Sequence, residues 1–345
     1  MKAWRRRRWP TCVLALLLVL GAGSIGTAPA RVASVGTSTA PAMQQGDERR
    51  ATTAITPPPA LPGSRGEGGY EPPVPLLWKV ADGDNSLWLL GAFHLLKEGD
   101  YPLSPDIARA FFEAEKLVFE LAPEELDGPE TQARFMAAAR FSDGRQLEDV
   151  LPQVTREKLA RLLARQGGSI EQLAEYQPWF VNLSLVLGLA HSLGYQPDLG
   201  VDRFLMMQAA RAGKPVGGLE TLDVQLAALA GAPIEEQLRA LDEYLAEPEQ
   251  MRLRLDELHQ AWRDGDLERL ERLTRLEMLH STPETYRIVN VERNDAWLER
   301  LDAMLRHDRG DALVVVGALH LLGEDGLVER LAGLGYEVER VCSDC

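Results

Sequence analysis

Residues 311–326 read DALVVVGALHLLGEDG, an apolar strand followed by a histidine, two leucines and a polar loop. Residues 86–99, SLWLLGAFHLLKEG, follow the same order near the other end of the chain. In both stretches a glycine stands three positions before the histidine. Strands that are apolar on both faces are typical of a sheet covered by helices. The repeat therefore predicts two related strands in one helix-covered sheet.

The segments around the two stretches predict the remaining strands and the first helices. The turn at residues 82–85 favours a hairpin, and Ser104 with Pro105 favours a helix start. The expected strands are 76–81, 86–94, 116–122, 214–220, 311–320 and 337–341, and the expected end helices are 104–116 and 325–333.

Residues from about 129 to 306 carry a helical pattern, interrupted by the short strand at 214–220. The ends of the folded region each run strand, G-x-x-H, helix, strand. The predicted fold is α/β, with a central mixed sheet built from two related strand-GxxH-helix-strand halves and a large helical insertion between them.

The N-terminal residues predict export. Residues 1–30 combine a basic start, a short apolar run and an Ala-x-Ala site at Ala28 and Ala30, which indicates a secretory signal peptide. An uncleaved anchor is the alternative. Residues 31–72 are rich in Pro, Gly, Ala and Thr and are expected to form a disordered linker before a domain at 73–345. The expected location is periplasmic or extracellular, without a stable membrane span after cleavage.

Charge and cysteine usage narrow the class of partner. The 345-residue chain has a formal net charge of -15, which disfavours a nucleic-acid partner. Cys342 and Cys345 are the cysteines beyond the expected signal peptide, and an oxidising compartment favours a disulfide between them. They lack the further ligands that a structural zinc site needs.

Polar side chains at the expected strand ends predict a functional site. His94, Glu120, Glu220 and His320 each lie at or near the end of an apolar strand, where ligands bind in open sheets with parallel strands. Two imidazoles and two carboxylates suit a divalent metal, with Mn, Co and Zn all compatible, or an acid–base cluster. We expect these side chains to line a cleft.

Each candidate also has a structural interpretation. A single histidine at a strand end is more often a hydrogen-bonded structural residue, but the repeated motif favours function. No Lys or Arg partner for Glu120 is evident from its neighbours, and Glu220 could instead cap the following helix.

Residues outside the strand ends give weaker signals. Arg293 could pair with a site carboxylate or lie on a solvated helix face, and Asp202 could reach the site or serve a helix start. His259 and His280 lie in charged helical surroundings, His307 lies in a polar stretch, and His191 lies in an apolar helix.

The motifs LWLLGAFHLL, LVFEL, KPVGGLET and ERNDAWLERL, with residues 313–341, resemble the TraB/PrgY/GumN family over residues 75–341. This resemblance implies a relationship to the Tiki-type metalloproteases and to the erythromycin esterase/ChaN-like fold. It implies that His94, Glu120 and His320 are metal-binding and catalytic residues. It also matches Arg293 and Asn294 to a further family motif.

Taken together, the residues and the resemblance predict an exported metal-dependent hydrolase, with a peptidase as the candidate class. Glu120 and Arg293 are the expected catalytic residues, and His94, Glu120, Glu220 and His320 the expected metal ligands. The substrate is an unidentified peptide or small molecule. The alternatives are a haem- or ligand-binding envelope protein without catalysis, and a non-catalytic partner in envelope or polysaccharide biology.

Overall fold

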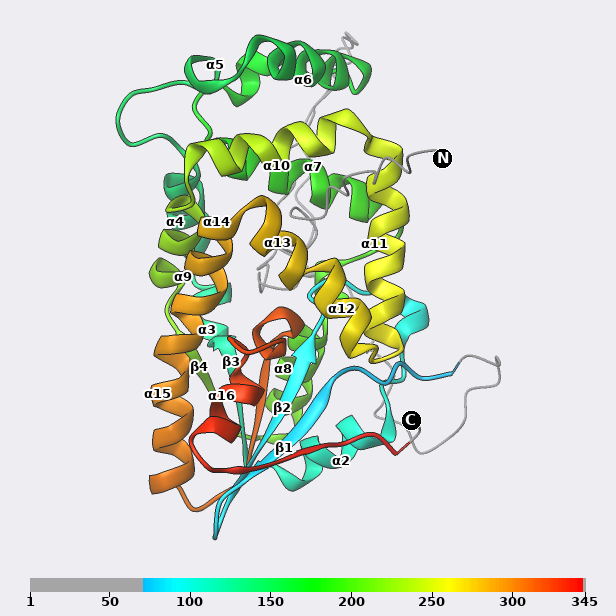
Figure 1. The fold of residues 1–345 in the computed structure, drawn as a ribbon, viewed down its shortest axis with the longest axis vertical. Helices are drawn as coiled ribbons and strands as arrows, with labels where there is room; N and C mark the ends of the chain where they lie inside the picture. The colour runs from blue at the N-terminus through cyan, green and yellow to red at the C-terminus, as the bar shows by residue number, and fades with distance from the viewer. Residues whose placement is uncertain (1–70, 344–345) are drawn as a thin grey trace, which may run out of the picture.

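The computed structural model describes residues 71–343, which form a mixed α/β fold around a six-stranded sheet (Figure 1). The strand order across the sheet is β4-β3-β5-β2-β1-β6. The strands are β1 Leu77–Ala81, β2 Ser86–Ala92, β3 Lys116–Leu121, β4 Val216–Glu220, β5 Ala312–Gly317 and β6 Glu337–Arg340. The expected hairpin is present, because β1 and β2 pair antiparallel across the turn at 82–85.

The two halves of the sheet interlock. Strand β5 of the second half lies between β2 and β3 of the first half and is parallel to both. Gly91 stands opposite Val316, and Ala92 stands opposite Gly317. The two G-x-x-H motifs therefore leave the sheet side by side, from the carboxyl ends of neighbouring parallel strands.

Gly91 permits this close approach. A Cβ atom at Gly91 would lie 3.2 Å from both the Cα and the Cβ of Ala318, in the other motif. This spacing is tighter than an ordinary van der Waals contact. The absence of a side chain at Gly91 thus lets the two motifs pack against each other.

The structure ends both motif strands earlier than expected. Strand β2 ends at Ala92 and β5 ends at Gly317. His94 follows in a bend, and His320 lies in the 3-10 helix η6, Ala318–Leu321. Both histidines therefore lie just beyond the sheet, and the expected strand at 311–320 was too long at its carboxyl end.

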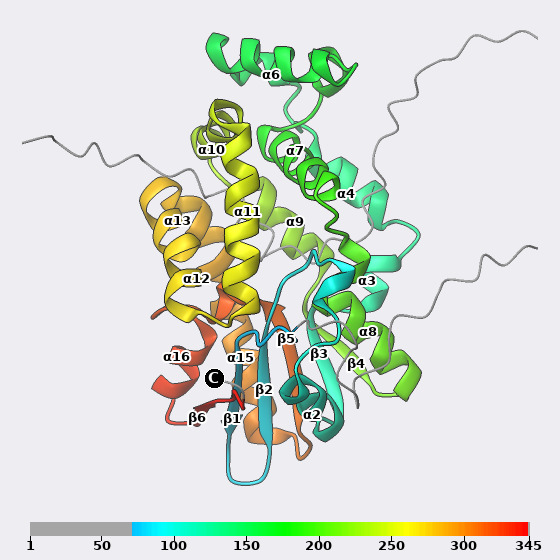
Figure 2. The ribbon, with the colours of Figure 1, turned by 90° about the vertical axis from the view of Figure 1, so that its right-hand side faces the viewer.

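Helices cover both faces of the sheet and the carboxyl ends of its parallel strands (Figures 1 and 2). Helices α2 and α8 lie on one face, and α15 and α16 lie on the other. The remaining long helices form a layer beyond the tips of β2, β3 and β5. Within it, α7 packs against α10, and α11 packs against α12.

The helices described by the structure are of two kinds, α-helices and 3-10 or π-helices. The α-helices are α2 Pro105–Glu113, α3 Pro123–Asp127, α4 Thr131–Ala139, α5 Leu147–Val150, α6 Gln153–Arg165, α7 Pro178–Ser192, α8 Val201–Ala212, α9 Leu222–Ala230, α10 Ile234–Ala246, α11 Pro248–Arg263, α12 Leu267–Leu273, α13 Arg275–Ser281, α14 Pro283–Tyr286, α15 Glu292–His307 and α16 Leu327–Gly333. The short helices besides η6 are η2 Glu98–Asp100, η3 Ile170–Leu173, η4 Pro197–Leu199 and the π-helix η5 Arg287–Val291.

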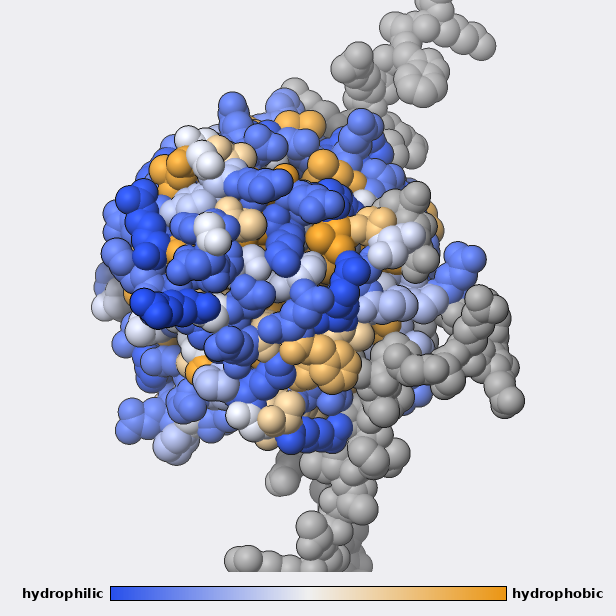
Figure 3. Space-filling model, turned by 90° about the horizontal axis from the view of Figure 1, so that it is seen from below, coloured by the Kyte–Doolittle hydropathy of each residue, from blue (hydrophilic) through white to orange (hydrophobic). Residues whose placement is uncertain are grey.

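The expected helical insertion is present, and β4 inside it joins the sheet beside β3. Seen from below, the surface is mostly hydrophilic, with hydrophobic residues in small groups (Figure 3). No helix within residues 71–343 is both long and apolar enough to span a membrane. Cys342 is disulfide-bonded. Cys345, the expected signal peptide and nearly all of the expected linker lie outside the described residues.

Candidate functional site

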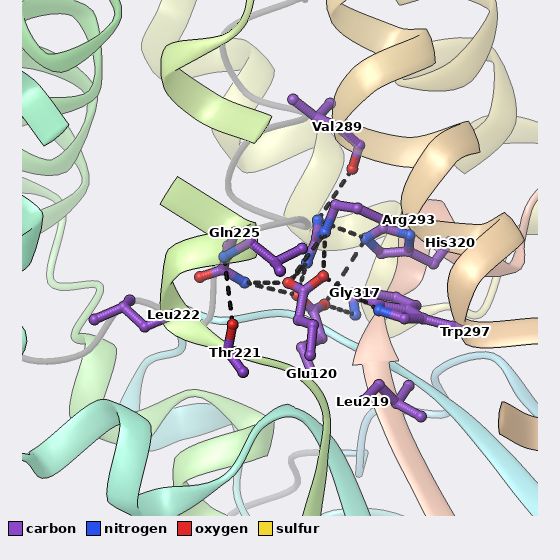
Figure 4. A network of polar contacts seen from close by, with 12 residues as sticks. Glu120, Leu219, Thr221, Leu222, Gln225, Val289, Arg293, Trp297, Gly317 and His320 are labelled. Carbon is purple, nitrogen blue, oxygen red and sulfur yellow. Dashed lines mark hydrogen bonds and ion pairs between the residues drawn. The ribbon is translucent and has the colours of Figure 1, made fainter. Parts of the chain in front are cut away.

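Five polar side chains meet where β2, β3, β4 and β5 end. His94 follows β2, Glu120 lies near the end of β3, Glu220 ends β4, and His320 follows β5. Arg293 reaches them from the start of α15 (Figure 4). We call these five residues the GxxH cluster. Their exposed fractions are small, from 0% for His320 to 4% for Arg293, and the Glu220 side chain is 4% exposed.

Arg293 holds the two carboxylates of the cluster together. Its Nη2 donates to Glu120 Oε2 at 2.6 Å and to Glu220 Oε1 at 2.7 Å. Its Nε donates to both oxygens of Glu220 at 3.1 Å. Buried carboxylates are costly unless they are paired and hydrogen-bonded. The guanidinium therefore provides the counter-charge that lets both carboxylates remain inside the fold.

His94 is oriented by a hydrogen bond from its Nδ1. Its Nδ1 donates to Asp202 Oδ1 at 3.0 Å, because an ionised carboxylate accepts hydrogen bonds and cannot donate them. Asp202 lies in the first turn of α8 and is 5% exposed. The His94 Nε2 is buried and has no hydrogen-bond partner among the described residues. It lies 3.7 Å from Glu120 Oε1.

His320 is also held through its Nδ1, but by a neutral partner. Its Nδ1 lies 2.7 Å from the amide oxygen of Asn294, so Nδ1 donates. Its Nε2 lies 3.2 Å from Arg293 Nη1, and a guanidinium has no acceptor, so Nε2 accepts. These two contacts require a neutral imidazole. The same Nε2 lies 3.9 Å from Glu120 Oε1, which also accepts the backbone N–H of Gly317 at 2.7 Å.

The surroundings push the two histidines toward opposite charge states. Burial lowers the pKa of His94, but Asp202 and Glu120 outweigh this effect and raise that pKa to about 10. Burial and the Arg293 charge hold the pKa of His320 well below its usual value. Burial raises the pKa of Glu120, yet Arg293 and the histidines bring it well below the usual range.

Two further residues complete the network, and the sequence analysis missed both. Gln225 on α9 donates to Glu120 Oε2 at 3.2 Å and to Glu220 Oε1 at 3.3 Å. The Trp297 ring lies 4.4 Å from the His320 ring, and its Nε1 donates to Glu220 Oε2. A single amide five residues after Glu220 in an apolar helix, and an indole four residues after Arg293, were the available signals.

The cluster does not fit a metal ion in the arrangement described. No three His, Cys, Asp or Glu side chains within residues 71–343 are placed so that they could hold one ion. The donor set itself is suitable, because both imidazoles are oriented through Nδ1, as metal-binding histidines are. However, Arg293 already bonds to His320 Nε2 and to Glu120. The predicted Mn, Co or Zn ion would have to share this space with a guanidinium.

The structure also corrects several expectations about these residues. Glu120 pairs with Arg293, which the neighbours of Glu120 in the sequence did not reveal but which one of the two interpretations of Arg293 allowed. Thr221 caps α9, so Glu220 is free to pair with Arg293. The cluster is enclosed, whereas the sequence led us to expect side chains lining a cleft. His259 is also buried, since its Nε2 lies 2.9 Å from Asp100 Oδ2, although its helix is rich in charge.

Comparison with known proteins places the chain in a family. The model of the TraB/PrgY/gumN family matches residues 76–340. The chain belongs to the TraB/PrgY/gumN family. It is 25% identical over 275 residues to the Escherichia coli protein named "Uncharacterized protein YbaP", covering 75% of this chain and 97% of that protein. The Shigella flexneri protein of the same name matches to the same extent. No solved structure matches the chain significantly.

Proposed function

We propose that this TraB/PrgY/gumN family member is an exported hydrolase whose active centre is the GxxH cluster. One observation carries the proposal. The His94 Nε2 is buried and has no hydrogen-bond partner among the described residues, although it lies 3.7 Å from Glu120 Oε1. Leaving a buried polar atom unpaired costs about 1–3 kcal/mol, so such an atom calls for a functional explanation.

The charge states suggest how protons would move. His94 carries a proton on Nε2 that it can give to a leaving group, and ionised Glu120 can accept a proton from an attacking water. Arg293 lies beside Glu120, where a guanidinium would stabilise negative charge that develops on a substrate oxygen. Asp202 and Asn294 would position the two imidazoles. No step in this proposal is routed through a metal.

Burial adds a requirement to the proposal. Since the cluster is buried, a substrate can reach it only if surrounding elements move, and we propose helix α9 and the η5–α15 segment, which supply Gln225 and Arg293, as those elements. A substrate group that competes for Arg293 would also remove the main cause of the low Glu120 pKa. Glu120 would then become a stronger base on substrate binding.

The test compares His94→Gln and Glu120→Gln with wild type on quenched fluorescent peptide and chromogenic ester libraries. We expect wild type to hydrolyse members of one library and both variants to be at least about 100-fold slower, the scale of a lost acid or base. His280→Ala, on an exposed position, is the control. Equal activity in wild type and His94→Gln, or no hydrolysis of either library, would contradict the proposal.

Elemental analysis of the same preparations tests the predicted metal separately. One Mn, Co or Zn ion per chain in wild type, lost in both His94→Gln and His320→Gln, would make the two imidazoles ligands. It would also require Arg293 to leave its contact with His320. Activity without stoichiometric metal would leave the catalysis to the protein's own side chains.

A further inference from the structure

A cavity of about 30 Å³ lies in the helical layer, one helical turn from the GxxH cluster. Its walls come from α7, α9, α10, α14 and η5, and include Trp179, Asn182, Leu229, Ala240 and Val289. By volume it has room for about two water molecules, or for a group of similar size.

Two helices connect the cavity to the cluster. On α9, Gln225 bonds to Glu120, and Leu229, one turn later, lines the cavity. On the segment running from η5 into α15, Arg293 belongs to the cluster, and Val289, one turn earlier, lines the cavity. The Val289 carbonyl accepts from Arg293 Nη1 at 3.0 Å, as Figure 4 shows. On each of these two elements, a residue of the cavity therefore lies one helical turn from a residue that contacts or belongs to the cluster.

Two residues that line the cavity each carry a buried polar atom without a hydrogen-bond partner among the described residues. Trp179 and Asn182 are 4% and 1% exposed and lie three residues apart on α7. Neither Trp179 Nε1 nor Asn182 Oδ1 has a hydrogen-bond partner among the described residues. The indole can only donate, and the amide oxygen can only accept. A group that satisfies both must be able to accept one hydrogen bond and donate another.

We propose that this cavity is the specificity pocket of the proposed centre and that it takes a small hydroxyl-bearing group of the substrate. Charge is disfavoured there, because the one charged side chain in the wall, Glu236, is already satisfied by the backbone N–H groups of Glu284 and Thr285. This inference rests on the proposed function, because only an enzyme has a substrate. The pocket chemistry itself does not depend on catalysis.

Ethanol and acetonitrile are the probes, because they have the same number of heavy atoms but acetonitrile cannot donate to Asn182 Oδ1. The readout is the indole ¹⁵N–¹H signal of Trp179 in the purified chain, assigned by its loss in Trp179→Phe. We expect a saturable shift with ethanol, at a Kd no tighter than about 1 mM for so small a ligand. Acetonitrile should bind the wild-type chain several-fold more weakly than ethanol does. Ethanol should bind the Asn182→Leu variant several-fold more weakly than it binds wild type.

Variants that fill the pocket complete the test. Ala240→Leu should abolish the ethanol shift, whereas Ala246→Leu, the same change at an exposed position on the same helix, should keep it. If Ala240→Leu fails to fold, the Asn182→Leu comparison decides alone.

Any of three results would overturn the proposed pocket. They are a non-saturating shift, equal binding of acetonitrile and ethanol, and ordered water that ethanol does not displace. Ethanol binding to a protein that hydrolyses neither library would retain the pocket and reject the hydrolase.

Discussion

At the scale of single residues, His94 and His320 show how partners set the state of identical side chains. Both histidines follow the same motif and both face Glu120 Oε1. Asp202 behind His94 outweighs burial and favours the charged ring, whereas burial and Arg293 favour the neutral ring of His320. Pairs of groups whose pKa values are pushed apart are typical of acid–base centres. The repeat in sequence therefore hides a difference in chemistry.

Replacing Asp202 tests this difference through the pH dependence of stability. The folded pKa of His94, about 10, lies above the ordinary value of 6.5, so its contribution is fully present below pH 6.5. That contribution is lost as the pH rises through about 10. Asp202→Asn should lower the free energy of unfolding at pH 6 by about 2–3 kcal/mol, the worth of a charged hydrogen bond. Urea unfolding across pH 6 to 10 measures it.

Asp84→Asn is the control for the Asp202→Asn prediction. Asp84→Asn, at an exposed position in the hairpin turn, should leave the wild-type pH profile unchanged. The Asp202→Asn profile should lose much of its slope between pH 6.5 and 10. If Asp202→Asn keeps the wild-type slope, Asp202 does not set the charge of His94.

The sequence could predict which residues of the site meet, but not how they bond. His94, Glu120, Glu220 and His320 follow apolar strands, and that placement alone brings them to one edge of the sheet. The ion pairs of Arg293 depend on the path of α15 across that edge, which local sequence does not encode. The roles of the site residues as metal ligands or catalysts remain predictions.

At the scale of elements, the approach of β2 to the second motif depends on one missing methyl group. Gly91→Ala would place a Cβ 3.2 Å from the Ala318 backbone, which cannot move without shifting η6. We expect a loss of about 1–3 kcal/mol in unfolding free energy, typical of overpacking. Ala318→Gly in the same chain should recover part of it, because one of the two close contacts disappears.

Gly217→Ala provides the matched control for this prediction. It changes a glycine in β4 of the same sheet, where an added Cβ meets nothing within 4 Å. Thermal and urea unfolding should show little change. A Gly91→Ala protein as stable as Gly217→Ala would mean that the two motifs can separate at little cost.

A second contact between elements ties the loop after β2 to α11. His259 on α11 bonds to the buried Asp100 of η2, and its ring stacks on Trp262. His259→Ala should cost about 3 kcal/mol of unfolding free energy, because it removes one partner of a buried charge. His280→Ala, at an exposed position, should change stability by less than about 0.5 kcal/mol.

The same unfolding series shows whether His259 is structural. Equal stability of His259→Ala and His280→Ala would mean that Arg263, which also pairs with Asp100, is sufficient. The sequence placed His259 only in charged helical surroundings. A buried partner from η2, far away in the chain, could not be read from that pattern.

At the scale of the whole molecule, the repeat predicted two halves but not their interlocking. Each half runs strand, G-x-x-H, helix, strand, and this order is what the chain adopts. Side-by-side halves would have been equally compatible with the sequence. The insertion of β5 between β2 and β3 is a long-range choice that buries both motif strands at the centre of the sheet. It also brings the two histidines to one carboxylate.

Limited proteolysis tests where the folded unit begins. The sequence predicts a linker up to residue 72, and residues on either side of that boundary bond to α11. The Val74 N–H donates to the Arg263 carbonyl at 2.7 Å, and Arg263 Nη2 donates to the Glu71 carbonyl at 2.8 Å. Trypsin should therefore cut within the linker, after Arg49, Arg50 or Arg65. Cleavage after Lys79, inside the paired strand β1, should be slow.

Intact mass and N-terminal sequencing of the resistant fragment show where the folded unit begins. We expect fragments that begin at Arg50, Ala51 or Gly66 and extend to the end of the chain. Their mass should rise by about 2 Da on reduction if Cys342 and Cys345 are paired, as the sequence predicts. A resistant fragment that begins inside residues 129–306 would mean that the helical layer folds without the sheet. The GxxH cluster, which needs both, would then not be a stable part of the molecule.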